Sequence, residues 1–254
     1  MASNRHVVIT GAAGGIGRAC VELYHQHGYR VWAIDQAQPD PPLPDGVIFI
    51  EADLAAAGEV DAVVDQLTQQ QLGGHLHVLV NNAALQIAKP LAETSADEWD
   101  RVHAVNLRAP FLLARGLYPA LAAAHGAVVN VSSVHAFATS ADIGAYASSK
   151  GGLLALTRAM AIEFAKDGVR ANAVLPGATD TPMLQAGLTR GHVQGSDAQQ
   201  RKDDLAGKIL LKRLATPEEI ARSVYFLGDS EVSAYITGQS LVVDGGALAR
   251  LSTE

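Results

Sequence analysis

Short runs of apolar and β-branched residues alternate with longer amphipathic segments along the whole chain. Most of the short runs are continuously apolar, which is typical of parallel strands that have helices over both faces. Strands are predicted at His6–Thr10, Arg30–Ile34, Val47–Glu51, Val78–Asn81, Ala127–Ser132, Arg170–Leu175 and Ser240–Val243. Helices are predicted at Ile16–His27, Glu59–Gln71, Asp97–Ala124, Ala145–Lys166 and Pro217–Leu227. This alternation predicts an α/β fold: a doubly wound parallel sheet of seven strands with helices on both faces.

The boundaries between these elements carry their own signals. Gly28, Gly126 and Gly168 follow predicted helices at positions that suit a helix C-terminus. The stretch from Met183 to Gly207 is polar and weakly periodic, and it is too long for an ordinary connection. We expect this stretch to be a lid on a single domain spanning residues 1–254, because nothing in the sequence marks a second domain.

Composition and charge narrow the classes of function. Hydrophobic residues make up 48% and charged residues 18% of the 254, which is a globular composition. The formal charge of -7 and the absence of basic clusters argue against nucleic acid as a partner. Cys20 is the single cysteine, the amino terminus lacks a secretion signal, and no apolar run is long enough to span a membrane. We therefore expect a soluble cytoplasmic protein.

A glycine-rich turn separates the first predicted strand from the first predicted helix. The segment reads Thr10-Gly11-Ala12-Ala13-Gly14-Gly15-Ile16-Gly17. Closely approaching glycine backbone and the N–H groups of the helix N-terminus can hold a pyrophosphate there. A tight strand-to-helix turn without a ligand is the alternative, but a dinucleotide is the natural ligand of such a segment.

The second predicted strand is followed at once by Asp35. A carboxylate in this place accepts hydrogen bonds from the adenosine ribose hydroxyls and repels a 2'-phosphate. Gly14 and Gln36 occupy flanking positions where a basic residue would welcome that phosphate. NAD is therefore expected rather than NADP, with Asp35 as a simple turn residue as the alternative.

Tyr146 and Lys150 are four residues apart on a predicted helix, so both side chains project from one face. A phenol has an ordinary pKa near ~10, and a neighbouring ammonium lowers the pKa by stabilising the phenolate. Tyr146 is thus a candidate acid/base. Ser133, at the end of the preceding strand, is placed to hold the same substrate oxygen.

Taken together, these motifs resemble the short-chain dehydrogenase/reductase family over essentially the whole chain. The resemblance rests on the turn from Thr10 to Gly17, Asp53-Leu54, Asn81-Asn82-Ala83-Ala84, Asn106, Ser133, the run Tyr146-Ala147-Ser148-Ser149-Lys150, Pro176-Gly177, Thr181, Gly238-Gln239 and Val243-Asp244-Gly245-Gly246. Ala84 departs from the family, which commonly has glycine there.

The resemblance implies a Rossmann fold, a nicotinamide across the carboxyl ends of the strands, and a catalytic tetrad of Asn106, Ser133, Tyr146 and Lys150. It implies that Tyr146 takes the alcohol proton while hydride leaves for the nicotinamide, that Lys150 binds the nicotinamide ribose, and that Asn106 anchors a water. It also implies a homotetramer formed through the two long helices. The implied cofactor-binding residues are Gly11, Gly14, Gly15, Ile16, Gly17, Asp35, Asp53, Leu54, Asn82, Ala83, Tyr146, Lys150, Pro176, Gly177, Thr179 and Thr181.

The substrate is less defined than the reaction. If the polar side chains of Gln86 and His135 face the pocket, they suit a sugar or polyol, because such groups left unpaired would cost roughly 1–3 kcal/mol each. Both are equally compatible with solvated loop positions. Alternative functions are an NADPH-dependent ketoreductase of acyl or steroid carbonyls and a non-catalytic NAD-binding regulator. We expect no metal site, since the histidine pairs are poorly spaced for one, and we expect Cys20, Trp32 and Trp99 to be packing residues.

Overall fold

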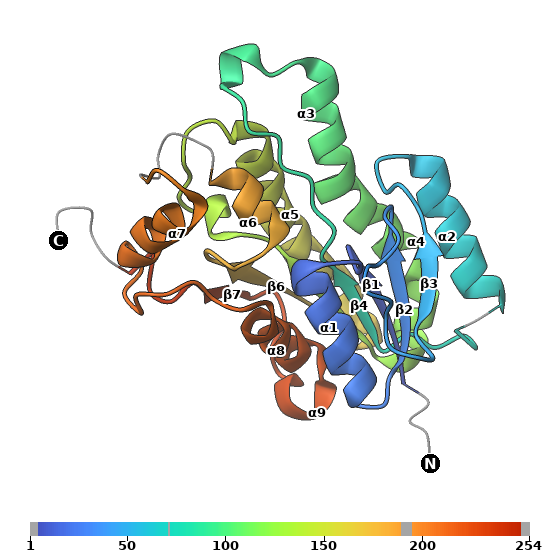
Figure 1. The fold of residues 1–254 in the computed structure, drawn as a ribbon. Coiled ribbons are helices and arrows are strands. Elements are labelled where there is room, and N and C mark those ends of the chain that lie inside the picture. Colours follow the sequence, from blue (N-terminus) through green and yellow to red (C-terminus); the bar gives the residue numbers. More distant parts are fainter. Residues whose placement is uncertain (1–4, 71, 189–194, 250–254) are drawn as a thin grey trace.

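A computed structural model describes residues 5–70, 72–188 and 195–249 of the chain. Seven strands form one parallel sheet in the order β3-β2-β1-β4-β5-β6-β7 (Figure 1). Each strand lies within one residue of its predicted bounds, so the predicted fold class is confirmed. The strands are β1 (His6–Thr10), β2 (Arg30–Asp35), β3 (Ile48–Glu51), β4 (Val78–Asn81), β5 (Ala127–Val131), β6 (Arg170–Pro176) and β7 (Ser240–Val243).

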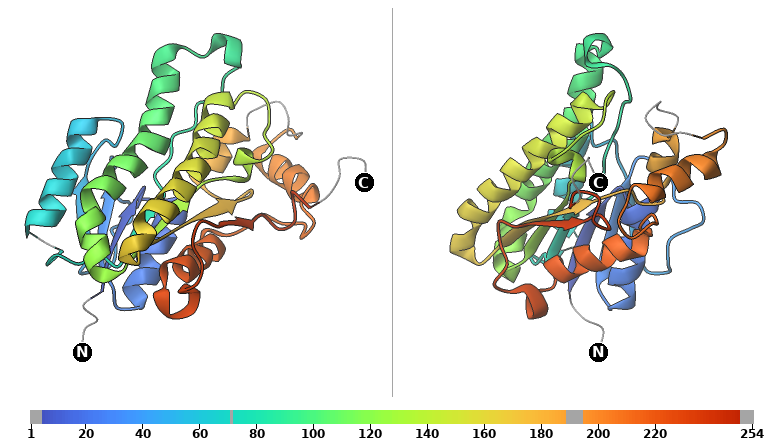
Figure 2. Two further views of the ribbon diagram at one scale, coloured as in Figure 1. Left: turned by 180° about the vertical axis from the view of Figure 1, so that it is seen from behind. Right: turned by 90° about the vertical axis from the view of Figure 1, so that its left-hand side faces the viewer.

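Helices cover both faces of the sheet and bury a separate apolar cluster on each. One face is covered by α2 (Ala57–Gln70), α4 (Ala109–Ala124) and α5 (Gly144–Phe164), and the other by α1 (Gly15–Gln26) and α8 (Pro217–Gly228). Figure 2 shows this division from two further directions. Strands β1 and β4 are neighbours although β2 and β3 lie between them in sequence, so the strand order reverses here. Ligands of such sheets bind at this reversal, beyond the carboxyl ends of the strands.

The predicted helix Asp97–Ala124 contains an irregularity that periodicity does not reveal. It begins as α3 (Ala96–His103), passes through a π-helical segment η2 (Ala104–Arg108) and continues as α4. A π turn accommodates an extra residue and often marks a functional site. Here the π-helical segment contains Asn106, whose side chain is completely buried.

Two other predictions about local structure need correction. Gly28 and Gly168 adopt positive φ after their helices as expected, but after α4 it is His125, with φ 47°, that takes the left-handed conformation. Gly126 serves a different purpose, because a Cβ on it would lie 2.5 Å from the carbonyl oxygen of Leu76. Trp32 is buried as predicted, whereas Trp99 is 37% exposed and stacks on His103.

The stretch predicted as a weakly structured lid contains two helices, α6 (Pro182–Gly187) and α7 (Ala198–Gly207). Residues 189–194 of this stretch lie outside the described part of the chain. The periodicity is weak because α7 buries none of its residues and therefore has no apolar stripe.

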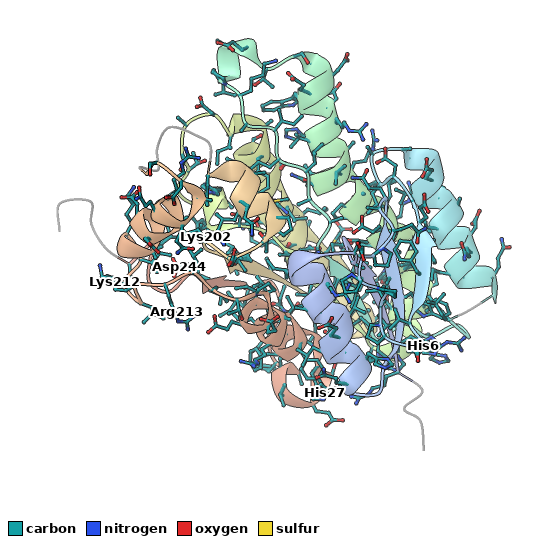
Figure 3. The ribbon with its side chains drawn as sticks, in the orientation of Figure 1. His6, His27, Lys202, Lys212, Arg213 and Asp244 are labelled. Atoms are coloured by element: carbon teal, nitrogen blue, oxygen red, sulfur yellow. The ribbon has the colours of Figure 1, made fainter. Side chains whose placement is uncertain are left out.

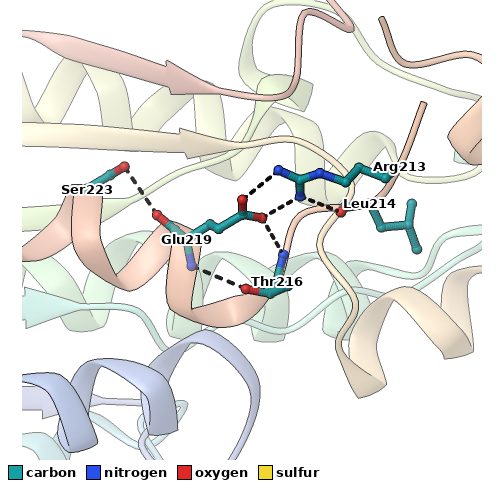
Figure 4. A network of polar contacts seen from close by, with 5 residues as sticks. All are labelled: Arg213, Leu214, Thr216, Glu219 and Ser223. Atoms are coloured by element: carbon teal, nitrogen blue, oxygen red, sulfur yellow. Dashed lines mark hydrogen bonds and ion pairs between the residues drawn. The ribbon is translucent and has the colours of Figure 1, made fainter. Parts of the chain in front are cut away.

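The connection from α7 to α8 ends in a polar network (Figure 4). Thr216 and Glu219 form a reciprocal capping box at the start of α8, and Arg213 donates to both carboxylate oxygens of Glu219 at 2.7 Å. Such a cap fixes where the helix begins. The remaining elements are the 3₁₀ turns η1 (Leu91–Glu93), η3 (Val134–Ala136) and η4 (Ala165–Asp167), and the short helix α9 (Ser230–Ser233).

Candidate active site

A cleft of about 650 Å³ lies at the carboxyl ends of the strands. Of the residues predicted for the site, only Gly17 and Asn106 are absent from its lining. The predicted residues that line it are Gly11, Gly14, Gly15, Ile16, Asp35, Asp53, Leu54, Asn82, Ala83, Gln86, Ser133, His135, Tyr146, Lys150, Pro176, Gly177, Thr179 and Thr181. The tertiary structure thus brings together segments that come from every part of the chain.

The glycine-rich turn leaves no room for side chains at two of its positions. A Cβ on Gly17 would lie 1.9 Å from the carbonyl oxygen of Gly11, and a Cβ on Gly11 would lie 2.8 Å from the Cα of Ala83. Gly11 also has φ 65°, a conformation that favours glycine. The side-chain amide of Asn82 donates to the carbonyl oxygens of Thr10 and Gly11 at 3.0 and 3.1 Å, which ties the turn to the end of β4.

The N-terminus of α1 opens into this turn with its N–H groups unshielded. Gly14 is the N-cap residue, no side chain caps the helix, and the first turn holds no acidic residue. The helix dipole and the N–H groups at such an end favour a phosphate. The turn therefore fits the pyrophosphate of a dinucleotide both in shape and in charge.

Asp35 ends β2 beside the same turn. Its two carboxylate oxygens accept from the main-chain N–H groups of Ala13 (2.9 Å) and Ala37 (3.2 Å). These bonds hold the carboxylate at the cleft, where the adenosine ribose of a dinucleotide would lie. Further along, Asp53 accepts from Arg101 at 3.3 Å and from the N–H of Ala55 at 2.9 Å.

Tyr146 and Lys150 lie on the buried stripe of α5, and both line the cleft. The Lys150 Nζ is 5.6 Å from the centre of the Tyr146 ring and donates to the carbonyl oxygen of Val131 at 2.8 Å. Lys150 is only 1% exposed, and this burial lowers the pKa of its ammonium to about 7. Lys150 is therefore a group that exchanges a proton near neutral pH, which spacing alone does not predict.

Ser133 follows the end of β5 and lines the cleft close to Tyr146. Its hydroxyl oxygen accepts from the N–H of His135 at 3.2 Å, and the His135 ring packs edge-on against the Tyr146 ring with centroids 6.1 Å apart. The preceding residue, Ser132, donates to the main-chain oxygen of Lys150 at 3.0 Å and so joins β5 to α5. A substrate oxygen between Tyr146 and Ser133 would have His135 as its neighbour.

Asn106 acts on the site from behind the cleft. Its amide nitrogen donates to the carbonyl oxygen of Leu85 (2.9 Å) and to the hydroxyl of Ser149 (3.0 Å), while its amide oxygen accepts from the N–H of Leu85 (2.7 Å). The Ser149 hydroxyl in turn donates to the main-chain oxygen of Tyr146 at 2.7 Å. The Asn106 side chain thus joins the π-helical segment to the helix that bears Tyr146 and Lys150.

One wall of the cleft comes from the stretch predicted as a lid, although the sequence analysis named none of its residues as site residues. It is formed by α6, α7 and the residues that follow them: Met183, Leu184, Gly187, Leu188, Leu205, Lys208 and Ile209. The missing signal is periodicity, because α6 has six residues and α7 has no buried stripe. Ser140 and Arg101 also line the cleft without any motif that predicts it.

No group of three or more His, Cys, Asp or Glu side chains within the described ranges is arranged to hold a metal ion. Two of the histidines, His6 and His27, are labelled in Figure 3 at the end of the molecule where the described chain begins.

Cys20 is buried in the apolar cluster beneath α1, where burial raises the pKa of its thiol to about 12. Among those same ranges, no helix has the length and apolar character needed to cross a membrane.

Comparison with known proteins gives matches over nearly the whole chain. Residues 11–247 match a family model described as enoyl-(acyl carrier protein) reductase. The cyclopentanol dehydrogenase of Comamonas sp. is 34% identical over 256 residues, covering 97% of this chain and 98% of that protein. The ligand-free aldohexose dehydrogenase of Thermoplasma acidophilum superimposes with a TM-score of 0.90 at 30% identity, covering 99% and 97% of the two chains.

Two further solved structures contain a nicotinamide cofactor. A 4-hydroxyisoleucine dehydrogenase complexed with NADH has a TM-score of 0.82 at 27% identity, over 97% of this chain and 100% of that one. A protein from Beutenbergia cavernae described as an NAD(P)-dependent gluconate 5-dehydrogenase, with NADP bound at low occupancy, has a TM-score of 0.85 at 33% identity over 97% of both chains.

Proposed function

The chain belongs to the short-chain dehydrogenase/reductase family, and on this premise we propose that it is an NAD-dependent oxidoreductase that interconverts a secondary alcohol and its carbonyl compound. The observation that carries the proposal is that Tyr146 and Lys150 share one face of α5 and line the same cleft as the glycine-rich turn. A protein that only binds the dinucleotide has no need of a proton donor paired with a lysine, which argues against a purely regulatory role.

Bound at this cleft, nicotinamide supplies the acceptor or donor of hydride. The Tyr146 hydroxyl exchanges the proton of the substrate oxygen, and the Ser133 hydroxyl donates a hydrogen bond to that oxygen as charge develops. Lys150 supports Tyr146 through its charge. A phenolate beside the lysine raises the pKa of the ammonium again, so a proton on Lys150 is most favoured when Tyr146 is ionised.

Asn106 orients the helix that bears Tyr146 and Lys150. Its side-chain amide is engaged with Leu85 and Ser149, so a water that relays the proton to solvent would bind the main-chain oxygen of Asn106 rather than its side chain. The π-helical segment around Asn106 fits this role, since π turns alter the pairing of main-chain carbonyls.

The preference for NAD rests on Asp35. The carboxylate is held at the cleft by two main-chain N–H groups, and a 2'-phosphate placed there would meet its negative charge. Gln36, which also lines this end of the cleft, brings no positive charge. The same residues disfavour the alternative of an NADPH-dependent ketoreductase.

The substrate we propose is a sugar or polyol with an apolar portion. Gln86, Ser140 and His135 offer polar groups to the cleft, and the wall formed by α6 and α7 is mainly apolar. Activity with NAD across aldoses, polyols, simple cyclic alcohols, steroids and acyl thioesters tests this choice. Oxidation confined to apolar alcohols, such as simple cyclic alcohols, hydroxysteroids or hydroxyacyl thioesters, would contradict it.

We also propose a homotetramer that assembles through α4 and α5. Phe111 on α4 is 44% exposed and Ile162 on α5 is 78% exposed, so apolar side chains of both helices face outward.

Tyr146→Phe tests the proposed chemistry most directly. The variant keeps the ring and loses the hydroxyl, so we expect turnover to fall by at least 10³-fold while NADH still binds. Tyr235→Phe is the matched control, because Tyr235 is fully exposed and lies outside the cleft lining. Turnover of Tyr146→Phe within tenfold of the parent would remove this residue from the proton transfer.

A further inference from the structure

Within the wall of the cleft formed by α6 and α7, helix α7 has little apolar packing of its own to hold it in place. Leu188 after α6 and Ile209 after α7 are each 3% exposed, yet no residue within α7 is buried. A helix without a buried stripe gains little from packing and needs other contacts to keep one position. The contacts that hold α7 therefore decide how well the substrate side of the cleft is formed.

Asp180 supplies contacts to both helices of this wall. Its carboxylate accepts from the Nζ of Lys202 on α7 at 2.7 Å, and hydrogen bonding from the side chain of Gln185 on α6 also lowers the pKa of this carboxyl. Figure 3 labels Lys202 on α7. The main-chain N–H of Asp180 donates to the carbonyl oxygen of Ala215 at 2.9 Å, which fixes the Asp180 backbone to the chain leading into α8.

Asp180 also stands between two residues of the cofactor side of the cleft. Thr179 and Thr181 line the cleft, and the Thr181 hydroxyl accepts from the N–H of Leu184 to cap α6. Asp180 thus lies in the segment expected to bind the cofactor, directly before the cap of α6, and its carboxylate reaches α7. Nothing in the spacing of Asp180 and Lys202 along the chain indicates this pairing.

We propose that Asp180 is the common anchor of α6 and α7, and that its ion pair with Lys202 is a positioning contact that sets the substrate-binding wall. The part of this inference that concerns substrate rests on the proposed function. The part that concerns the position of α7 does not.

The ion pair between Asp180 and Lys202 holds α7 locally and adds little to the stability of the whole fold. The Lys202 and Asp180 side chains are 21% and 46% exposed, and partly exposed pairs contribute little to global stability. Hydrogen bonding from Lys202 lowers the pKa of the Asp180 carboxyl, which favours the charged form of that carboxyl. Loss of the ion pair should therefore loosen α7 and leave the sheet unaffected.

Hydrogen exchange of main-chain amides measures the position of α7 without any turnover. In Asp180→Asn and Lys202→Met we expect the amides of α7 to exchange at least fivefold faster, while those of α8 keep their parent rates. Lys202→Arg retains the charge and should restore slow exchange. The matched control is Asp61→Asn, which breaks the exposed pair with Arg115 at 3.8 Å outside the cleft lining.

Steady-state kinetics with the best alcohol of the substrate panel give the second readout. Loosening the wall should raise KM at least fivefold with kcat within about twofold, and the affinity for NADH should stay at its parent value. Lys202→Arg and the control Asp61→Asn should both have the KM of the parent.

The proposal is overturned if α7 exchanges at the parent rate in both Asp180→Asn and Lys202→Met. It is equally overturned if α8 and the strands accelerate together with α7, since that would be general loss of stability. If the parent oxidises no alcohol in the panel, the proposed function fails and the exchange result still decides the anchor.

Discussion

Replacing Lys150 with methionine should make the protein more stable and inactive. Lys150 is 1% exposed, and the fall of its pKa from 10.5 to about 7 corresponds to about 5 kcal/mol, at about 1.4 kcal/mol per pKa unit. The substitution also leaves the carbonyl oxygen of Val131 without the Lys150 donor, which costs about 1–3 kcal/mol. The expected net gain below pH 7 is therefore about 2–4 kcal/mol in the free energy of unfolding.

The pH dependence of this gain follows from the direction of the pKa shift. A lowered pKa in the folded state means that the unfolded chain binds more protons between about pH 7 and 10.5. The cost of burying Lys150 is thus complete below pH 7 and disappears as the pH approaches 10.5. The advantage of Lys150→Met should be greatest at pH 6 and should shrink by about 1.4 kcal/mol for each pH unit above 7.

Guanidinium denaturation of the parent and Lys150→Met at pH 6, 7.5 and 9 measures this difference. Lys166→Met serves as the control, since Lys166 is exposed near the end of the same helix and should show no gain. A Lys150→Met variant less stable than the parent at pH 6, or a difference that stays constant up to pH 9, would refute the reasoning. Turnover should be lost at every pH.

Three other predictions concern the cofactor and the assembly. Gly17→Ala should abolish dinucleotide binding in calorimetry, because the added Cβ would lie 1.9 Å from the Gly11 oxygen; unchanged NADH affinity would show that the turn is not the cradle. Asp35→Ala with Gln36→Arg should shift the ratio of kcat/KM toward NADP at least tenfold, and a parent that already prefers NADP would contradict our interpretation of Asp35. Light scattering should give the mass of a tetramer, and a stable monomer at micromolar concentration would rule out the proposed assembly.

The sheet could be predicted almost residue by residue because its signals are local. β1 and β4 have the predicted bounds, since a strand buried on both faces is a continuous apolar run that ends where polar residues begin. The edge strand β7 also has its predicted bounds, although Leu241 and Val242 are exposed. The pairing of Tyr146 with Lys150 was predictable for the same reason, because four residues span one helical turn. Their common position at the cleft agrees with that prediction.

The errors lie where distant segments decide the local structure. His125 takes the left-handed conformation after α4 because Gly126 is needed for a close approach to Leu76. The π-helical segment around Asn106 is held by hydrogen bonds to Leu85 and Ser149, which no periodicity of its own helix reveals.

What the sequence determined by itself is the order of the elements, the glycine-rich turn and the position of Tyr146 and Lys150 on one face of a helix. Each of these depends on neighbours within a few positions, where φ, ψ and side-chain direction are set by the chain itself. Only the tertiary structure decided that burial lowers the pKa of Lys150 to about 7 and that Asp180 pairs with Lys202 of α7. Desolvation and ion pairing depend on which remote segments pack together, and the local sequence around each residue does not indicate these contacts.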